Sequence, residues 1–372
     1  MRTIRNVLII LPSACKTTAE KMSYELLSAL EDLGYNTVPI VDRIRDCPAA
    51  NPKEFNFLKC KNKKLNFFAT VINTLKLCFL YIRKKIDLVI VADQEFTIPM
   101  VYAAKIQSRA VFVYIKKQPS KYDLKYRSLD LADSLILCAN SFKKFFIREG
   151  VLRDKVKILS NFLPDYQIDF LSCITKKDFI QKINCSKDNP KIILQSGSIF
   201  EHKGHRTLIE AIRQLKESGL NVIGVISVRG YAKDKITEKI LKTLIKQSNL
   251  GDDIFIIEDI LEDELMKISD IYVQPSFEDG LPISVLKAAS HGLPIVAGAC
   301  EGLKDLIDDK KGGFLFNPSN VNELIEILKG LLEKEQDIAQ LVEYTKEKLL
   351  RENSRERFLE DLRNIINSKY LG

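Results

Sequence analysis

A short acidic loop runs directly into a predicted helix over residues 278–291. The loop reads Glu-Asp-Gly-Leu-Pro at 278–282, and the helix begins at Ile283. The first backbone N–H groups of a helix have no partners inside it, and the helix dipole makes that end positive. We therefore expect the N–H groups of Leu281, Ile283 and Ser284 to form an anion site that suits a diphosphate.

The other residues of this loop suit a sugar bound beside the diphosphate. Gly280 lets a ligand approach the backbone closely, and Pro282 fits the first turn of the helix. Carboxylates accept paired hydrogen bonds from neighbouring hydroxyl groups. We expect Asp279 or Glu278 to orient the sugar.

A second segment places a basic residue at another helix start. A buried strand ends in the small-residue turn Gly197-Ser198, and Lys203 stands just before the next predicted helix. A lysine here can reach a phosphate that lies across the strand ends, and it would offset the charge of a leaving diphosphate without a metal ion. Either segment alone could be the plain beginning of a helix. Together in one α/β array they predict a single site.

Buried strands alternate with helices along both halves of the chain, as the spacing of apolar residues shows. In the first half, strands are predicted at 7–11, 37–41, 87–93, 110–115 and 134–140, helices at 19–34, 66–86 and 141–150, and the segment 155–163 closes the array. In the second half, strands are predicted at 191–198, 221–228, 253–259 and 270–276, and helices at 205–219, 232–248, 262–268 and 283–291. Residues 43–64 are expected to form a polar loop and 165–190 a linker.

Two successive βαβ arrays predict an α/β fold with two Rossmann-like, doubly wound parallel-sheet domains. We place the first domain at 1–172 and the second at 185–349. Ligands of such sheets bind beyond the carboxyl ends of the strands. The cleft between two facing sheets is therefore the expected active site.

Positive charge is concentrated in the first half of the chain. The net charge is +8, and residues 1–172 hold 28 Lys and Arg against 17 Asp and Glu, whereas the remainder holds 29 against 32. A basic half indicates an anionic partner, such as a nucleic acid, a membrane surface or a phosphorylated ligand. A genome that favours lysine codons is the alternative explanation.

Cysteine and histidine usage argues against a metal site. The eight cysteines include no Cys-x-x-Cys pair, and the chain has three histidines, so we expect no metal. We interpret the cysteines as reduced, in a cytoplasmic protein. The apolar run 7–11 is too short for a signal peptide, and no uninterrupted apolar stretch reaches the roughly 18 residues of a membrane span.

At these motifs the chain resembles the retaining GT-B glycosyltransferases of family 4, the glycosyl transferases group 1. The likeness runs from about residue 191 to 330 and includes SDIYVQPS, the DGLP turn, HGLPIVA and GGFLF. It implies a GT-B fold and a transfer from a nucleotide-sugar with retention, without metal or other cofactor. It also implies that Asp279 contacts the donor sugar, that Glu278 could substitute for it, and that Lys203 binds phosphate. In such folds the chain end returns to the first domain, so we assign 350–372 there.

The chain departs from the family pattern on the donor side at two positions. The family commonly has a second glutamate eight residues after the first acid, and Lys287 stands in that place. Lys287 could contact the phosphate of the donor instead of its ribose. Ser198 stands where a basic residue often follows the turn glycine.

The acceptor side departs from the pattern as well. The segment 12–18, Pro-Ser-Ala-Cys-Lys-Thr-Thr, replaces a glycine-rich loop, and the histidine often found after the middle strand is absent. We therefore expect Ser13, Lys16 and Lys116 on the side of the acceptor.

A cluster of lysines precedes aromatic residues near the predicted helix 66–86. The residues are Lys59, Lys61, Lys63, Lys64, Phe67 and Phe68. This pattern is typical of contact with an anionic bilayer. It gives the hypothesis of peripheral docking on the inner face of the membrane, toward a glycan or lipid-linked glycan acceptor. The alternative is a helix packed on the sheet with solvated lysines. No nucleic-acid-binding motif is present, so we expect no nucleic acid partner.

Two classes of function remain open. The first is a glycosyltransferase of surface polysaccharide biosynthesis, and the second is a catalytically inactive relative that binds a nucleotide-sugar or a protein partner. A nicotinamide-dependent oxidoreductase does not fit, because no Gly-x-Gly-x-x-Gly turn follows the strands that end near Leu11 and Leu194.

Overall fold

The computed structural model describes nine stretches of the chain. They are residues 4–12, 18–42, 53–54, 63–93, 96–116, 128–163, 174–228, 234–333 and 338–368. The chain divides into two compact units, Met1–Asn161 with Glu356–Gly372, and Phe162–Arg355. The sequence places the corresponding limits at 172–185 and 349–350.

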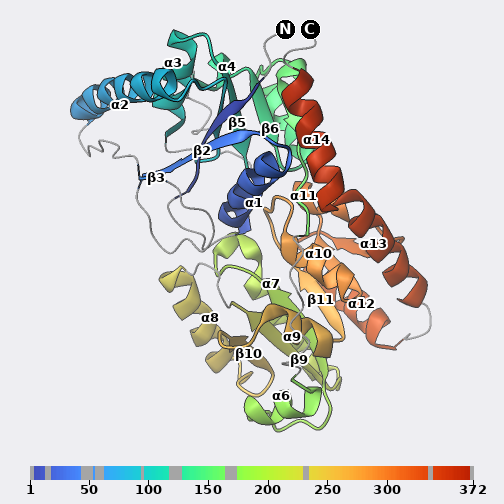
Figure 1. The fold of residues 1–372 in the computed structure, drawn as a ribbon. Coiled ribbons are helices and arrows are strands. Elements are labelled where there is room, and N and C mark those ends of the chain that lie inside the picture. Colours follow the sequence, from blue (N-terminus) through green and yellow to red (C-terminus); the bar gives the residue numbers. More distant parts are fainter. Residues whose placement is uncertain are drawn as a thin grey trace. The chain divides into compact units, whose positions relative to one another are not determined.

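The first unit is built on a parallel sheet of seven strands in the order β3-β2-β1-β4-β5-β6-β7 (Figure 1). Its strands are β1 (Asn6–Ile10), β2 (Asn36–Val41), β3 (Lys53–Glu54), β4 (Leu88–Val91), β5 (Ala110–Ile115), β6 (Ser134–Leu137) and β7 (Val156–Ile158). Its helices are α1 (Thr18–Asp32), α2 (Lys63–Arg83), α3 (Thr97–Ile106), α4 (Ser128–Leu131), α5 (Ser141–Arg148), the 3-10 turn η3 (Arg153–Lys155) and α14 (Arg355–Ser368).

The second unit is built on a parallel sheet of six strands in the order β10-β9-β8-β11-β12-β13. Its strands are β8 (Lys191–Ser196), β9 (Val222–Ser227), β10 (Ile254–Ile257), β11 (Ile271–Gln274), β12 (Ile295–Gly298) and β13 (Phe314–Phe316). Its helices are α6 (Lys176–Lys182), the 3-10 turn η4 (Glu201–Lys203), α7 (His205–Glu217), α8 (Lys235–Gln247), α9 (Glu262–Ile268), α10 (Ile283–Ser290), α11 (Glu301–Leu306), α12 (Val321–Glu333) and α13 (Ile338–Glu352). Two Rossmann-like parallel sheets, as predicted, are thus present.

The second sheet is buried on both faces because successive side chains of a strand point to opposite sides. In β8, Ile192 and Leu194 pack into a core with residues of α6, α9 and α10. Their neighbour Ile193 packs into a second core with residues of α7, α8 and α12. This double burial explains why the strand reads as a continuous apolar run rather than as an alternating pattern.

The sequence patterns leave several of the described helices unpredicted, and α3 and α6 are among them. α3 is buried on most of its surface and shows little contrast between faces, so it carries a weak amphipathic signal. α6 is short and polar and lies inside the segment expected to be a linker. It is nevertheless held in the second unit by Phe179, whose side chain is buried in the core.

The polar segment 43–64 is described only in part. Residues 53–54 form β3, and α2 begins at Lys63 rather than at 66. Lys59 and Lys61 lie outside the described residues, and the side chains of Lys63, Lys64 and Phe67 are likewise not described. None of the described helices is long and apolar enough to cross a membrane.

The placement of α6 can be tested by truncating its buried aromatic residue. Phe179→Ala removes a fully buried ring, so we expect it to lower the free energy of unfolding by about 3 kcal/mol or more. Lys177→Ala, on the exposed side of the same helix, is the matched control and should have little effect. Urea unfolding followed by circular dichroism measures both. Equal stability of the two variants would contradict the assignment of α6 to the core.

Candidate active site

The site lies where the order of strands in the second sheet reverses. β8 and β11 are neighbours, with Ile193 paired to Ile271, while β9 and β10 continue on one side and β12 and β13 on the other. Parallel sheets open a crevice beyond the carboxyl ends of the strands at such a point. The segments that follow β8 and β11 therefore meet at the same edge.

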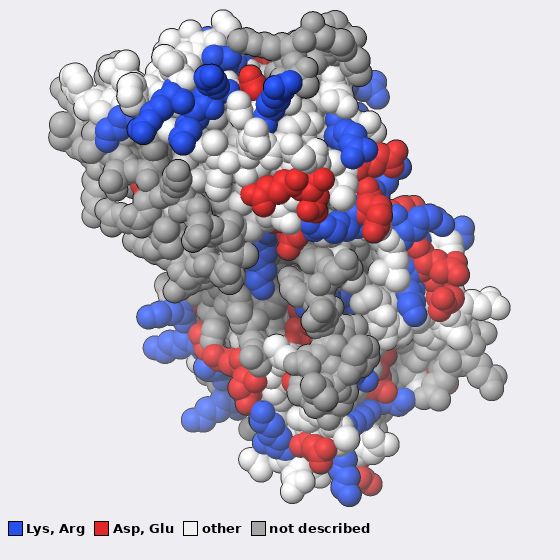
Figure 2. Space-filling model, viewed as in Figure 1, with Lys and Arg blue, Asp and Glu red and all other residues white. Residues whose placement is uncertain are grey.

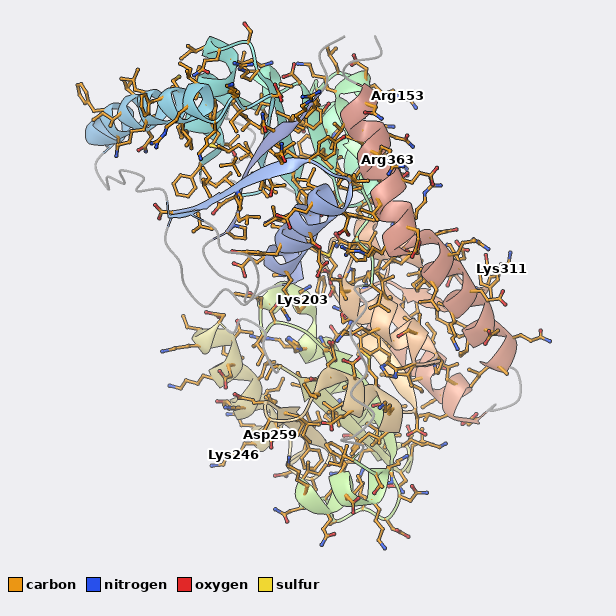
Figure 3. All side chains as sticks on the ribbon, viewed as in Figure 1. Arg153, Lys203, Lys246, Asp259, Lys311 and Arg363 are labelled. Atoms are coloured by element: carbon orange, nitrogen blue, oxygen red, sulfur yellow. The ribbon has the colours of Figure 1, made fainter. Side chains whose placement is uncertain are left out.

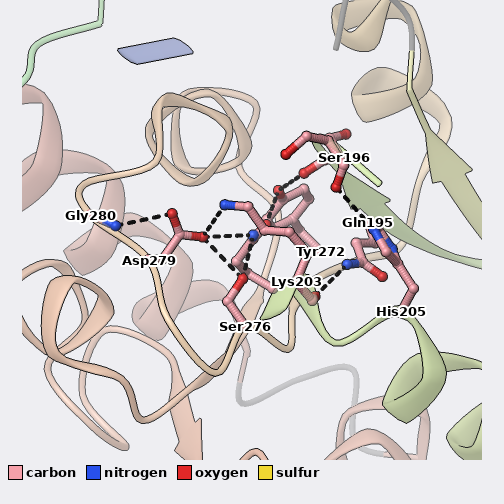
Figure 4. Close-up of polar contacts among 10 residues, drawn as sticks. Gln195, Ser196, Lys203, His205, Tyr272, Ser276, Asp279 and Gly280 are labelled. Atoms are coloured by element: carbon pink, nitrogen blue, oxygen red, sulfur yellow. Dashed lines mark hydrogen bonds and ion pairs between the residues drawn. The ribbon is translucent and has the colours of Figure 1, made fainter. Parts of the chain in front are cut away.

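The structure brings Lys203 and Asp279 into direct contact at this edge (Figure 4). Lys203 Nζ donates to Asp279 Oδ2 at 2.8 Å, although the two residues are 76 positions apart in the chain. Their side chains are 15% and 8% exposed. Figure 3 shows Lys203 beside the beginning of α7. The basic and acidic residues singled out from separate motifs thus belong to one site.

The Asp279 carboxylate is held by a network of uncharged groups. Its Oδ2 also accepts from Ser276 Oγ at 3.0 Å and from Gln274 Nε2 at 3.1 Å. Its Oδ1 accepts from the backbone N–H of Gly280 at 3.1 Å. These bonds fix the plane of the carboxylate in a pocket with little solvent.

Behind this network, Tyr272 fixes the amide of Gln274. The buried hydroxyl of Tyr272 donates to Gln274 Oε1 at 2.7 Å. Burial raises the pKa of Tyr272 well above its usual value, so the hydroxyl keeps its proton and remains a donor. Gln274 must then turn its Nε2 toward Asp279, which matches the bonds it makes there.

The turn that carries Lys203 is fixed to both strands. Gln195, at the end of β8, donates from Nε2 to the carbonyl of Lys203 at 2.9 Å. The N–H of Phe277 donates to the carbonyl of His202 at 2.8 Å, which joins the turn to the acidic loop. Within the described parts of the chain, Gln195 Oε1 and Ser196 Oγ are buried without a hydrogen-bond partner.

Two glycines allow the backbones around the site to touch. Gly204 has a φ of +71°, and a Cβ there would lie 1.9 Å from the carbonyl oxygen of Pro275. A Cβ at Gly302, in α11, would lie 1.5 Å from the carbonyl oxygen of Gly280. Any larger side chain would push the acidic loop away from its neighbours, so both contacts define the geometry of the site.

Two helices begin at this edge without a side-chain cap. α7 starts after Gly204 and α10 starts after Pro282, and no side chain accepts a hydrogen bond at either N-cap. Leu281, Ile283 and Ser284 are themselves buried residues at the beginning of α10. Two positive helix ends and the ammonium of Lys203 can together stabilise an anion.

The turn after β8 faces open space. Gly197 has a φ of +146°, and nothing lies within 4 Å of a Cβ built there. The carbonyl of Ser198 accepts from His205 Nε2 at 3.1 Å. Glu278 is exposed beside Asp279, so of the two candidate acids Asp279 is the one held within the network.

Lys287 is grouped with acids of α9. Its Nζ lies 2.9 Å from Asp263 Oδ2 and 3.1 Å from Glu262 Oε2. Burial alone would lower the pKa of Lys287, but these two carboxylates outweigh burial and raise it. For Asp263 the two effects have the opposite signs. Burial alone would raise the pKa of its carboxyl group, but the contacts with His291 and Lys287 outweigh burial and lower it. The expected contact of Lys287 with the donor remains a prediction.

On the acceptor side, one expected residue is described. Lys116 directly follows β5, and its Nζ donates to Ser23 Oγ of α1 at 2.7 Å. Ser13 and Lys16 lie outside the described residues. Among the residues that the structure describes, no group of three His, Cys, Asp or Glu is placed to hold a metal ion.

Sequence reasoning missed the residues that support the pair. Gln195 and Gln274 each end an apolar strand, and a polar residue at that position is a readable signal because the ends of neighbouring parallel strands share one edge. Gly302 carries no such signal, because its role depends on a backbone that is distant in the sequence.

Replacing Gly204 tests the close backbone contact. Gly204→Ala should collide with Pro275 and separate Lys203 from Asp279. We expect it to weaken binding of inorganic pyrophosphate, a probe for the expected diphosphate site, by about tenfold, which isothermal titration measures. Gly219→Ala is the matched control, because Gly219 has a φ of +83° with nothing within 4 Å. It suffers the same backbone strain without the collision. Similar pyrophosphate affinities for the two variants would show that the contact does not shape the site.

Buried His205 predicts a dependence of stability on pH. Burial lowers the pKa of His205 to about 4 from 6.5, so the folded protein keeps the ring neutral. The neutral ring stabilises the folded protein fully above pH 6.5, the usual pKa of histidine in the unfolded chain. This stabilisation is lost as the pH falls through 6.5 toward 4. The loss reaches about 3 kcal/mol at low pH.

His205→Gln removes this titration while keeping a side-chain donor. Between pH 7.5 and pH 4.5, the free energy of unfolding of the parent protein should fall by about 2 to 3 kcal/mol more than that of the variant. Urea titrations at both pH values measure the difference. Parallel pH profiles would contradict the role of His205.

Known proteins resemble this chain in sequence over part of its length. Residues 176–348 match the family model for glycosyl transferases group 1. The N,N'-diacetylbacillosaminyl-diphospho-undecaprenol alpha-1,3-N-acetylgalactosaminyltransferase of Campylobacter jejuni is 26% identical over 216 residues, which are 56% of this chain and 53% of that protein. The chain spans about half the length of the curated relatives it matches.

Solved structures match both units of the chain. A glycosyltransferase from Rickettsia africae has a TM-score of 0.79 at 16% identity and covers 99% of each chain. HepE of Anabaena, in complex with UDP and glucose, has a TM-score of 0.78 at 15% identity and covers 97% of this chain and 99% of that one. These likenesses confirm the expected GT-B class of fold. The family match covers residues 176–348, which lie within the second unit, so that unit is similar to the glycosyl transferases group 1.

Proposed function

We propose that this chain is a glycosyltransferase that moves a sugar from a nucleotide-sugar to a glycan or lipid-linked glycan, with retention, in surface polysaccharide biosynthesis. The observation that carries the proposal is the contact of Lys203 with Asp279 at the switch point of the second sheet. The contact places the Lys203 ammonium, which can bind a diphosphate, beside the Asp279 carboxylate, which can bind a sugar. One nucleotide-sugar molecule can therefore reach both groups.

The donor diphosphate binds between Lys203 and the beginning of α10. The ion pair alone is neutral, so the negative charge of the diphosphate is met by the positive ends of α7 and α10 and by a shift of the Lys203 ammonium toward phosphate. These fixed charges stabilise the phosphate as it leaves, which supplies most of the rate acceleration. We propose that neither a metal ion nor another cofactor takes part.

The donor sugar binds at the Asp279 carboxylate. Oδ2 already accepts three hydrogen bonds, whereas Oδ1 accepts from the Gly280 N–H among the contacts described. A carboxylate oxygen has two lone pairs, so Oδ1 is the atom that receives a sugar hydroxyl. No protein nucleophile is required, because the acceptor hydroxyl attacks on the face from which the diphosphate departs. Its oxygen bonds to the anomeric carbon as the bond from that carbon to the phosphate oxygen breaks, and the departing phosphate takes up the hydroxyl proton.

The names of similar proteins support particular substrates. HepE of Anabaena was solved with UDP and glucose, which makes UDP-sugars the first donors to test. The Campylobacter jejuni relative is named for a substrate linked to diphospho-undecaprenol, which supports a lipid-linked acceptor. A lipid-linked acceptor fits an enzyme that works at the inner face of the membrane, and we propose that location.

Substitutions in the pair test the proposed function. Asp279→Asn keeps the shape of the side chain but removes the charge, and we expect kcat to fall by about 10²-fold or more. Lys203→Met should lower donor affinity as well as kcat, because it removes a phosphate contact. Glu278→Gln should have a much smaller effect than Asp279→Asn, since Glu278 is exposed. Release of UDP from UDP-sugars measures turnover.

Controls separate loss of chemistry from loss of folding. Lys304→Met, half-exposed in α11, should retain the parent kcat, and all variants should keep the parent melting temperature within a few degrees. Addition of EDTA should leave turnover unchanged. Full activity of Asp279→Asn would refute the proposed role of the carboxylate. Absence of turnover in the parent protein with every donor would favour an inactive, nucleotide-sugar-binding relative.

A further inference from the structure

α2 exposes an apolar face opposite the face that it buries. At 100° per residue, the buried side chains define the face that packs on the first unit, and they are Ala69, Asn73, Thr74, Leu77 and Tyr81. The opposite face carries a row of exposed apolar side chains, here called the α2 stripe. Its members are Phe68 (63% exposed), Val71 (41%), Ile72 (41%), Leu75 (63%), Phe79 (68%) and Ile82 (65%).

The α2 stripe is continuous along the helix. Its six positions fall within an arc of about 100° and recur at intervals of three and four residues, which is the spacing of one helix face. Single exposed apolar residues are common on protein surfaces, whereas a contiguous row that includes two phenylalanines marks a site of interaction. The fold of the first unit does not explain the stripe, because α2 packs on α3 and its buried side chains lie on its other face.

Positive charge borders the α2 stripe. Lys76 and Arg83 lie on one flank of the arc, Lys84 follows the helix, and all three are exposed. The sequence from 63 to 86 contains no Asp or Glu. Figure 2 shows basic side chains over the part of the first unit where Figure 1 draws α2. An apolar face that has cations on one flank and no acid along the helix complements a surface that is apolar inside and anionic outside.

We propose that the α2 stripe inserts into the surface of an anionic phospholipid bilayer. α2 lies in the plane of the interface, with the apolar row among the acyl chains and with Lys76, Arg83 and Lys84 at the lipid phosphates. The proposal rests on the proposed function in one respect, since a lipid-linked acceptor gives the contact its purpose. It assigns the membrane contact to the apolar face of α2 itself.

A second copy of the chain fits the α2 stripe less well. Pairing two identical stripes about a two-fold axis would bring the same basic flanks together, and like charges oppose such an interface. An anionic lipid surface meets both the apolar row and its cations. The charge pattern therefore favours lipid over self-association.

Vesicle sedimentation tests the proposal with the full-length protein. The parent protein should bind vesicles of equal parts phosphatidylglycerol and phosphatidylcholine, bind pure phosphatidylcholine weakly, and lose affinity as salt rises. The double variant Leu75→Ser with Phe79→Ser should bind the anionic vesicles at least tenfold more weakly, because it removes two large inserted side chains. Arg83→Gln with Lys84→Gln should weaken binding to anionic vesicles about tenfold.

A matched control removes exposed apolar residues that belong to no row. Ile236 and Leu152 are 72% and 62% exposed, and the double variant Ile236→Ser with Leu152→Ser should bind vesicles like the parent. Unchanged binding by the Leu75 and Phe79 variant, or no binding by the parent, would overturn the proposal. A parent dimer that this variant dissociates, without vesicle binding, would assign the α2 stripe to a second copy instead.

The test separates the membrane contact from the transfer reaction. Release of UDP from a donor in the absence of vesicles should be the same for the parent and the α2 stripe variants, because α2 contributes no residue to the site around Lys203. Vesicle binding without any turnover would refute the proposed function and leave the membrane contact standing. Turnover without vesicle binding would support the proposed function and refute the membrane contact.

Discussion

The candidate site depends on backbone contacts that leave no room for a side chain. Gly204 lies against the carbonyl of Pro275, and Gly302 lies against the carbonyl of Gly280. These contacts hold the loop after β11 between the turn after β8 and the beginning of α11. Only because the backbones approach this closely can Lys203 reach Asp279 at 2.8 Å and the Phe277 N–H reach the His202 carbonyl. The chemistry proposed for the pair follows from that packing.

α10 has an uncapped, positive N-terminus at the site and a paired lysine one turn further along. Its first turn faces the site without a side-chain cap, so its positive end remains available to an anion. One turn further on, Lys287 is neutralised by Glu262 and Asp263 of α9. In the family that the chain resembles, this position is commonly a glutamate, so Lys287 reverses the sign of the charge there. Glu262 and Asp263 of α9 balance that positive charge by pairing with it. The site therefore gains no unpaired buried cation from Lys287.

The first unit shows how one helix can satisfy a fold and still expose a large apolar surface. α2 needs only one face to cover its neighbours, and Ala69, Leu77 and Tyr81 supply it. The exposed side chains Val71, Ile72, Leu75, Phe79 and Ile82 lie away from this packing face. An apolar side chain left in water gives no gain in stability, so a second face of this kind is better understood as a binding surface than as part of the core.

Much of the architecture could be read from local patterns. Continuous apolar runs such as VLII and IIL predict buried parallel strands, because both faces of the sheet are covered. The acidic loop before Ile283 and the lysine before His205 both stand at helix starts, as predicted. α6 was missed although Thr175 caps its N-terminus by accepting from the Asp178 N–H, because about two turns of polar helix give no clear periodic signal.

The sequence by itself determined the two parallel-sheet arrays and the residue types at the strand ends, since both follow from spacing along the chain. Only the tertiary structure decided which of these residues meet. Asp279 rather than Glu278 lies in the network, Lys287 pairs with α9, and Gly302 supports Gly280. These outcomes depend on neighbours that are distant in the chain. Burial and electrostatic interactions depend on which residues are close in space. The spacing of residues along the chain does not show this for residues that are far apart in the sequence.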